Sequence, residues 1–151
     1  MKRAGFTMIE LIFVIVILGI LSAVALPKFL GVSDQARVGK LTAYVGTLDR
    51  TVLPPYWSQS LTEGNNGSIA TYSDKIIRDL PAPDRITVAF AAANLEPSSY
   101  VFTNGTAPTK TVGSKVYNGV TYTIACADGN ATSAARCDVY NGSKWLLLSN
   151  Q

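Results

Sequence analysis

The chain has 151 residues, of which 48% are hydrophobic and 15% are charged, and its formal net charge is +3. That length suffices for one domain with a hydrophobic core, and so small a charge gives no argument for a nucleic-acid surface. The lack of histidine excludes a histidine-based triad, a histidine-ligated metal and an imidazole acid or base. The sequence also has no nucleotide-binding loop or nucleophile–base set, so we expect neither an enzyme nor a cofactor.

The N-terminal segment is a long apolar run that contains one carboxylate. Residues 6–26 would extend about 31 Å as a helix, which matches a hydrocarbon core of about 30 Å. Lys2 and Arg3 before the run favour a cytoplasmic N-terminus. Glu10 is the one charge between them and Lys28, and a lone carboxylate in a membrane helix costs about 3 kcal/mol or more. Glu10 therefore requires a cationic partner, which another chain would have to bring.

The residues around Glu10 carry a family resemblance. Gly5-Phe6-Thr7-Met8-Ile9-Glu10, behind a short basic leader, resembles the type III signal of type IV pilins and type II secretion pseudopilins. The resemblance is specific from residue 3 to about residue 31 and fades beyond. It implies that a prepilin peptidase cuts between Gly5 and Phe6, removes the leader 1–5 and methylates the new Phe6 amine. It also implies that Glu10 pairs with the Phe6 amine of a neighbouring subunit as a filament grows.

An ordinary secretory signal is the alternative interpretation of this segment. Ala23-Val24-Ala25 offers a small-x-small cleavage site before Leu26. Glu10 argues against this alternative because a charge weakens the hydrophobicity that such a signal needs. The helical pattern also continues past the site.

Two residues weaken the predicted membrane helix. Pro27 removes the hydrogen bond to residue 23, and Gly19 is a poor helix former. In filaments of the resembled family the matching stretch is often melted. We therefore expect Gly19 to Pro27 to unwind in the assembled state and to form a curved, continuous helix in the isolated subunit.

Beyond Lys28 the pattern becomes amphipathic. Apolar side chains recur at spacings of three and four, at Val38, Leu41, Val45, Leu48 and Val52. Pro54-Pro55 predicts the end of the helix near residue 53. The expected organisation is a membrane or filament-core helix over 6–27, an amphipathic continuation over 28–53 and a globular head over 54–151.

The predicted head combines one short helix with antiparallel strands. Residues 54–72 are predicted as loop and 73–80 as a helix capped by Ser73, while 81–98 stays ambiguous. Strands are predicted over 100–103, 115–117, 120–124, 137–140 and 143–148. Asn118-Gly119 and Asn141-Gly142 are type I′ hairpin signals. The fold class is α+β, a long N-terminal helix packed on a small antiparallel sheet, which is also the architecture of the resembled family.

The two cysteines, Cys126 and Cys137, predict a disulfide because they lie in the half expected to face an oxidising compartment. Two free buried thiols remain the alternative. The resemblance implies that the bridge staples an exposed loop with subunit-specific contacts. Asp128-Gly129-Asn130 with Asp138 has too few ligands for calcium, so we expect a solvated turn there and no metal.

Two further patterns are interpreted without a functional role. Asn66, Asn104, Asn130 and Asn141 match glycosylation sequons, but turn residues produce such matches by chance. Trp57 and Trp145 are predicted to belong to the core rather than to a binding platform.

We interpret the chain as a structural subunit that polymerises into a type IV pilus or a type II secretion-like pseudopilus. Its expected partners are copies of itself, related minor pilins, the prepilin peptidase, membrane lipid, and an inner-membrane assembly platform with a cytoplasmic ATPase, without nucleic acid. Before assembly it would cross the bacterial inner membrane once with its head in the periplasm; afterwards it would lie in a periplasmic pseudopilus or an extracellular pilus. In the resembled family the major pseudopilins usually hold the region of the disulfide loop with calcium instead, and they carry a Tyr-Pro-containing segment after the long helix, which this sequence lacks. These two departures favour the pilus. The alternative is a membrane-anchored or secreted binding domain, such as an adhesin, which does not polymerise and does not need Glu10.

Overall fold

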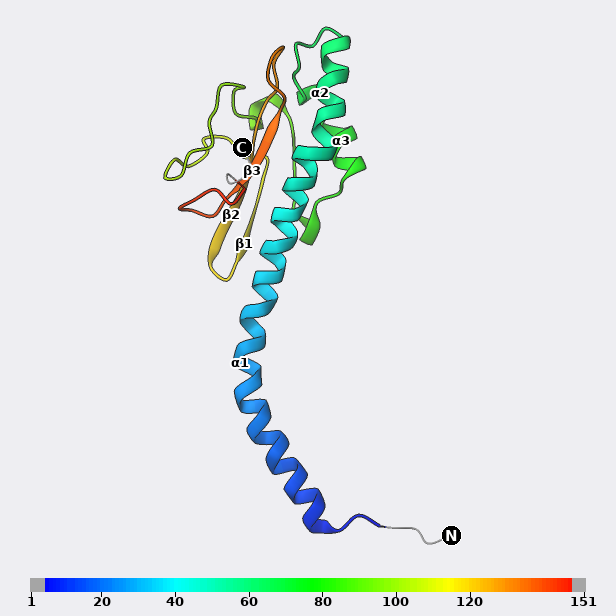
Figure 1. The fold of residues 1–151 in the computed structure, drawn as a ribbon, viewed down its shortest axis with the longest axis vertical. Helices are drawn as coiled ribbons and strands as arrows, with labels where there is room; N and C mark the ends of the chain where they lie inside the picture. The colour runs from blue at the N-terminus through cyan, green and yellow to red at the C-terminus, as the bar shows by residue number, and fades with distance from the viewer. Residues whose placement is uncertain (1–4, 148–151) are drawn as a thin grey trace. The chain divides into compact units, whose positions relative to one another are not determined.

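The computed structural model describes residues 5–147, so most of the predicted leader, residues 1–4, and residues 148–151 lie outside the described part. The chain divides into two compact units, one ending at Ala36 and the other beginning at Arg37. Figure 1 shows the helix α1, which contributes to both units, and the small sheet of the second.

The first unit is the N-terminal part of α1 (Met8–Thr47). The helix continues through Gly19 and Pro27, and the Ser22 hydroxyl donates to the Leu18 carbonyl at 2.7 Å. Within residues 5–147, the helical run Met8–Thr62 is the one long and apolar enough to cross a membrane. Unwinding of the Gly19 to Pro27 stretch in a filament stays a prediction.

The prediction that Pro54-Pro55 end the helix is wrong. Helical backbone continues through a π-helical turn η1 (Leu48–Val52) into α2 (Leu53–Thr62), with the prolines in the first turn of α2. Proline is tolerated there because the first N–H groups of a helix have no intrahelical acceptor. The wider turn shifts the hydrogen-bond register, and the Leu53 N–H donates to the Leu48 carbonyl. The first half of the loop predicted over 54–72 is therefore helical.

The apolar stripe on the C-terminal part of α1 is confirmed as core. Leu41, Val45 and Leu48 are fully buried, and each such side chain contributes about 1.5–3 kcal/mol by leaving water. They belong to one cluster with Ile76 of α3, Phe90 of the segment between α3 and β1, and Ile124 and Val139 of the sheet. This cluster is the main core of the head.

The sheet has three antiparallel strands in the order β1 (Gly113–Tyr117), β2 (Val120–Ala127) and β3 (Arg136–Tyr140). The first hairpin prediction is confirmed. Asn118 and Gly119 have φ values of 48° and 76°, as a type I′ turn requires, and Tyr117 pairs with Val120 across the turn.

Two predicted strands do not form. Residues 100–103 belong to no strand, and in the described part beyond β3 only an isolated bridge joins Tyr140 to Trp145. The strand predicted over 143–148 does not form because the side-chain oxygen of Asn141 accepts from the Ser143 and Lys144 N–H groups and closes a wider turn. Residue 148 of that predicted strand lies outside the described part.

The short helix α3 (Ser73–Asp79) is confirmed, but Ser73 does not cap it. Its hydroxyl instead accepts the Phe90 N–H at 3.0 Å. The ambiguous segment 81–98 contains two 3₁₀ turns, η3 (Pro83–Arg85) and η4 (Ala92–Asn94). A further 3₁₀ turn, η2 (Ala70–Tyr72), precedes α3.

A second, smaller cluster centres on Trp145. Trp145 packs edge-on against Phe102, with ring centroids 4.8 Å apart, and beside Tyr140 at 5.0 Å. Ala125 and Ala127 of β2 belong to this cluster, whereas Ile124 and Cys126 belong to the main core. Because strand residues alternate between faces, the two clusters lie on opposite faces of the sheet.

Candidate functional site

Gly5 and Phe6, the predicted cleavage position, precede the first turn of α1. Both are exposed and non-helical, and Phe6 is 85% exposed. A Cβ on Gly5 would meet no atom within 4 Å. The peptide bond between them therefore lies outside α1, between two exposed residues.

Glu10 forms a capping box with Thr7. The Thr7 N–H and hydroxyl both donate to Glu10 Oε2, at 3.0 and 2.8 Å, and the Glu10 N–H donates to Thr7 Oγ1 at 3.3 Å. Two N-terminal N–H groups of α1 thereby gain side-chain acceptors. Our sequence analysis missed this role of Thr7, although the spacing T-x-x-E signals it. Hydrogen bonds do not neutralise the carboxylate, so the need for a cation in an apolar surrounding remains.

The apolar side chains that follow Glu10 are uncovered. No part of the apolar window is buried within the structure, and Phe13, Leu18 and Leu21 are each more than half exposed. A patch of this size on a single subunit marks a surface for lipid or for another protein.

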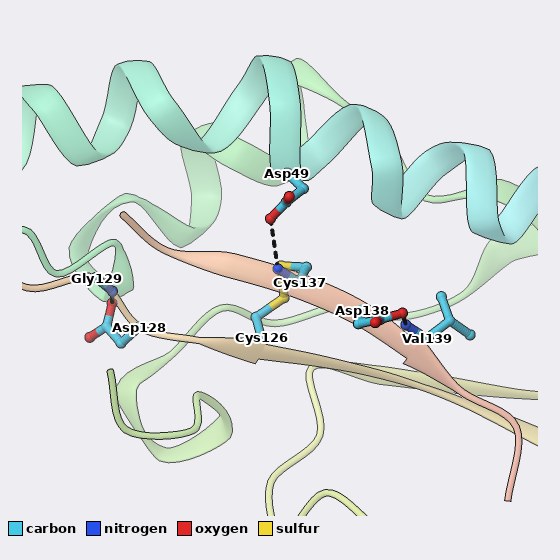
Figure 2. Close-up of a disulfide and its surroundings, with 7 residues drawn as sticks. All are labelled: Asp49, Cys126, Asp128, Gly129, Cys137, Asp138 and Val139. Carbon is cyan, nitrogen blue, oxygen red and sulfur yellow. Dashed lines mark hydrogen bonds between the residues drawn. A yellow bond between two sulfur atoms is a disulfide. The ribbon is translucent and has the colours of Figure 1, made fainter. Parts of the chain in front are cut away.

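The disulfide between Cys126 and Cys137 is confirmed, with both residues buried. The two are directly opposed in the β2–β3 register. Figure 2 shows that Asp49 of η1 reaches the bridge, where its Oδ1 accepts the Cys137 N–H at 2.9 Å. Burial raises the pKa of Asp49, although this hydrogen bond and the charges of Arg136 and Arg50 oppose the rise. The bridge thus joins β2 to β3 at the point where η1 contacts the sheet.

The loop closed by the disulfide is less exposed than expected. Within residues 127–135 only Ala131 and Thr132 are exposed. The Trp57 indole N–H donates to the Asn130 carbonyl at 2.9 Å. A Cβ on Gly129 would lie 2.2 Å from the Gly67 carbonyl oxygen. The loop is therefore packed on α2 and on the segment before η2, and little of it remains for contacts with other molecules.

Asp128 is half-buried and engaged in the fold, whereas we expected a solvated turn. Its carboxylate accepts from the Ser68 hydroxyl at 2.6 Å, the Ile69 N–H at 2.8 Å and the Gly129 N–H at 2.9 Å. Its oxygens hold the loop to the segment before η2. No group of three or more potential metal-ligating His, Cys, Asp or Glu residues occurs among residues 5–147.

The sequon at Asn130 is also engaged in the fold. Its side-chain oxygen accepts from the Thr132 and Ser133 N–H groups, and its Nδ2 donates to the Ser98 hydroxyl at 3.0 Å. A glycan on this nitrogen would replace one of its two hydrogens beside Ser98.

Asp138 is a fully buried carboxylate that the sequence suggested only as a weak calcium ligand. Its Oδ1 accepts from the Val139 and Leu147 N–H groups, at 2.6 and 2.9 Å, and holds the segment after β3 to the sheet. Its Oδ2 has no hydrogen-bond partner in the described part of the chain. Burial raises the pKa of Asp138, the nearby Asp49 raises it further, and the N–H donors oppose the rise.

Comparisons with known proteins agree with the N-terminal geometry. Residues 1–26 match the model of the prokaryotic N-terminal methylation motif. The chain is 51% identical over 43 residues to the type IV narrow pilus major component PilA5 of Thermus thermophilus, a match that covers 28% of this chain and 37% of that protein. It is 37% identical over 67 residues to the type II secretion system core protein G of Pseudomonas aeruginosa, covering 42% and 47%.

A third relative is a fimbrial protein of Neisseria meningitidis serogroup B, 33% identical over 97 residues, with 61% of this chain and 57% of that protein covered. The chain thus spans less than two thirds of the length of each of these relatives. No solved structure matches it. The methylation motif, the long apolar helix, the antiparallel sheet and the three relatives show that the chain belongs to the type IV pilin and pseudopilin family.

Proposed function

We propose that the chain is a filament subunit that is cut between Gly5 and Phe6, methylated at Phe6 and polymerised. The observation that carries this proposal is the uncovered apolar surface between Met8 and Leu26, with a carboxylate near its start. An anchor that remained in lipid would need the apolar surface but not Glu10, whereas a filament subunit uses both.

Assembly would exchange lipid for neighbouring helices around the apolar surface. In that surrounding the Glu10 carboxylate needs a positive charge, since hydrogen bonds from Thr7 leave its charge in place. The mature Phe6 amine of a neighbouring subunit would supply it. Before assembly the helix would sit in the inner membrane with the head in the periplasm. A separate cytoplasmic ATPase on an assembly platform would drive extraction.

Among filaments, we favour a pilus over a secretion pseudopilus. Asp128 directs its oxygens to Ser68, Ile69 and Gly129, and a buried disulfide closes the loop that contains it. The head thus stabilises this region with a covalent bridge and with hydrogen bonds to Asp128. Minor pilins of the same filament are expected partners in either case.

The decisive test is the intact mass of the protein in filaments sheared from cells, with fragmentation of the N-terminus. We expect a chain that begins at a methylated Phe6 and contains one disulfide. A chain that begins at Leu26 would contradict the processing and indicate an ordinary secreted protein. The mature chain in the inner membrane without surface filaments would contradict the pilus and favour a pseudopilus.

Two substitutions separate the charge of Glu10 from its capping role. Glu10→Gln keeps an acceptor for Thr7 but removes the charge, whereas Glu10→Ala removes both. If pairing with an amine drives assembly, both variants lose filaments while the head stays folded and the chain stays membrane-inserted. Normal filament yield from Glu10→Gln would show that capping, not charge pairing, is the role of this residue. A non-polymerising adhesin would tolerate both substitutions.

A further inference from the structure

The head contains a hollow of about 320 Å³ that does not belong to the surfaces described above. Figure 1 shows α3 beside α2, and the Tyr56 hydroxyl of α2 donates to Asp79 Oδ2 of α3. The hollow is lined by residues of η1, α2 and α3, namely Thr51, Val52, Pro55, Tyr56, Gln59 and Asp79. Its volume is at the lower end of the range for ligand pockets, about 300–1,000 Å³, so a small ligand would fill it.

The lining combines two kinds of side chain. The ring of Tyr56 offers apolar surface together with Val52 and Pro55. The remaining lining residues offer a hydroxyl, an amide and a carboxylate, from Thr51, Gln59 and Asp79. Pockets for small ligands have this composition, because apolar and aromatic side chains provide contact area and a few polar groups fix the orientation of the ligand.

The polar side chains keep hydrogen-bonding capacity for a ligand. Asp79 accepts from the Tyr56 hydroxyl, and an ionised carboxylate has further lone pairs on its two oxygens. Gln59 Nε2 donates to Glu63 Oε1 at 2.6 Å, and a primary amide has a second N–H and a carbonyl oxygen. The hollow therefore offers both donors and acceptors.

Neighbouring side chains hold the lining residues in place. The rings of Tyr56 and Tyr72 pack with centroids 5.5 Å apart. The Tyr72 hydroxyl donates to Glu63 Oε2 at 2.5 Å, and the other oxygen of Glu63 accepts from Gln59. A ligand would thus meet side chains that are already ordered, which reduces the entropy lost on binding.

The backbone beside the hollow is also unusual. Thr51 and Val52 belong to η1, which is a π-helical turn. Such turns are rare and occur frequently at functional sites. The position of η1 is a second observation, independent of side-chain chemistry, that supports a binding role.

We propose that this hollow binds a neutral pyranose sugar, either free or as one residue of a polysaccharide. A pyranose ring has C–H groups on its faces, which pack against an aromatic ring, and hydroxyls around its edge, which both donate and accept. The Tyr56 ring matches the face, while Gln59 and Asp79 match the hydroxyls. The charge of Asp79 repels an acidic sugar, which favours a neutral one.

The test is saturation-transfer difference NMR on the full chain in nanodiscs of zwitterionic phosphatidylcholine, with empty discs as the blank. The probes are the methyl glycosides of glucose, galactose and N-acetylglucosamine. We expect at least one of them to bind saturably, with the strongest transfer to the C–H protons on one face of its ring. The absence of saturable transfer to all of these probes would overturn the proposal.

Two carboxylates of α3 provide a matched pair of variants. Asp79→Asn should weaken binding by about tenfold, the loss expected for one charge-assisted hydrogen bond. Asp74→Asn is the control, because it makes the same change at an exposed residue of α3 that does not line the hollow. Its binding should stay within about twofold of the unsubstituted chain. An equal loss from both variants would contradict a site at the hollow.

Two substitutions of Tyr56 test the aromatic contact. Tyr56→Phe and Tyr56→Leu both lose the hydroxyl that donates to Asp79, but only Tyr56→Leu loses the aromatic ring. We expect Tyr56→Leu to bind about fivefold more weakly than Tyr56→Phe, with both folded by near-ultraviolet circular dichroism. Equal binding by the two variants would show that no ring packs on Tyr56 and would overturn the proposal.

Two further probes test the chemistry of the ligand. Sorbitol has the hydroxyls of a sugar but no ring, so it should not compete with the bound glycoside, and equal competition would overturn the proposal. Glucuronic acid should bind more weakly than the methyl glycoside of glucose, and Asp79→Asn should narrow this difference by removing the repulsion. Preference for the acid in the unsubstituted chain would contradict a site for neutral sugars.

A trisaccharide of the sugar that binds distinguishes the two sources. Binding that is about tenfold tighter than that of the single glycoside would assign the site to a polysaccharide, because further residues add contacts. Equal affinity would assign it to a single sugar ring. Both outcomes support a sugar site, and neither depends on whether the chain polymerises.

Discussion

Asp138 is the residue at which the stability of the head depends most directly on charge. Asp138→Asn keeps the oxygen that accepts from Val139 and Leu147 but removes a buried charge whose second oxygen has no partner among residues 5–147. We expect the free energy of unfolding at pH 7 to stay constant or rise by about 1 kcal/mol. Asp138→Ala should lower it by about 2 kcal/mol, because two N–H groups lose their acceptor. Urea unfolding followed by near-ultraviolet circular dichroism measures both.

The raised pKa of Asp138 also predicts how the free energy of unfolding changes with pH. The pKa of Asp138 is raised in the folded head above the ordinary value of 3.8, so the folded state binds more protons than the unfolded state above that pH. The free energy of unfolding should therefore fall as the pH rises from about 4 through the folded pKa. In Asp138→Asn this fall should shrink but persist, because the pKa of Asp49 is raised too. An unchanged profile would show that Asp138 has an ordinary pKa.

Substitution of Tyr44 tests how its buried hydroxyl affects the free energy of unfolding. Its side chain lies in the main core, and its hydroxyl has no hydrogen-bond partner within residues 5–147. Tyr44→Phe should leave the free energy of unfolding unchanged or raise it by up to about 1 kcal/mol, since an unpaired buried hydroxyl is unfavourable. Tyr117→Phe is the control, because it loses the bond to Asp84 and should cost about 1 kcal/mol. A larger loss from Tyr44→Phe than from this control would contradict the expectation.

At the scale of elements, the parts governed by local pattern were predictable. The stripe of Leu41, Val45 and Leu48 and the turn at Asn118-Gly119 each follow from spacing or turn chemistry within a few residues. The helix end predicted at Pro54-Pro55 was wrong because proline disfavours a helix interior but suits the first turn of a helix. Only the π-helical turn before the two prolines decides that they occupy a first turn. The bonds from Trp57 and Ser68 to the disulfide loop join residues about sixty or more positions apart, and no local pattern contains them.

The disulfide is the element-scale feature with the largest expected effect. Replacement of both Cys126 and Cys137 by alanine removes a bridge across 11 positions of sequence, which should lower the free energy of unfolding by about 3 kcal/mol on the chain-entropy model. The single variant Gly129→Ala keeps the bridge but forces a Cβ against the Gly67 carbonyl. We expect it to release the loop while β2 and β3 stay paired. Amide hydrogen exchange checks this: fast exchange at Asn130 with slow exchange at Val139 is expected, and fast exchange at both would contradict it.

At the scale of the whole molecule, the two units need opposite surroundings, apolar for the first and aqueous for the second. Residues 8–36 contribute exposed apolar side chains, while the core of the head begins at Val38 and Leu41. A chain of residues 31–151 should therefore fold cooperatively, with a free energy of unfolding within about 1 kcal/mol of the full chain. It should also stay monomeric without detergent, whereas the full chain should associate through its apolar helix. Sedimentation velocity and urea unfolding measure these properties.

A shorter chain that begins at Thr42 supplies the control for this truncation. It lacks Val38 and Leu41, and the loss of the fully buried Leu41 should cost about 2–5 kcal/mol. If the 31–151 chain were as unstable as this control, the apolar helix would be part of the folding unit. Loss of filaments in a Glu10 variant could then result from impaired folding. Equal stability of the 31–151 chain and the full chain would separate folding from assembly. Filament yield in Glu10→Gln would then report on the contact between subunits.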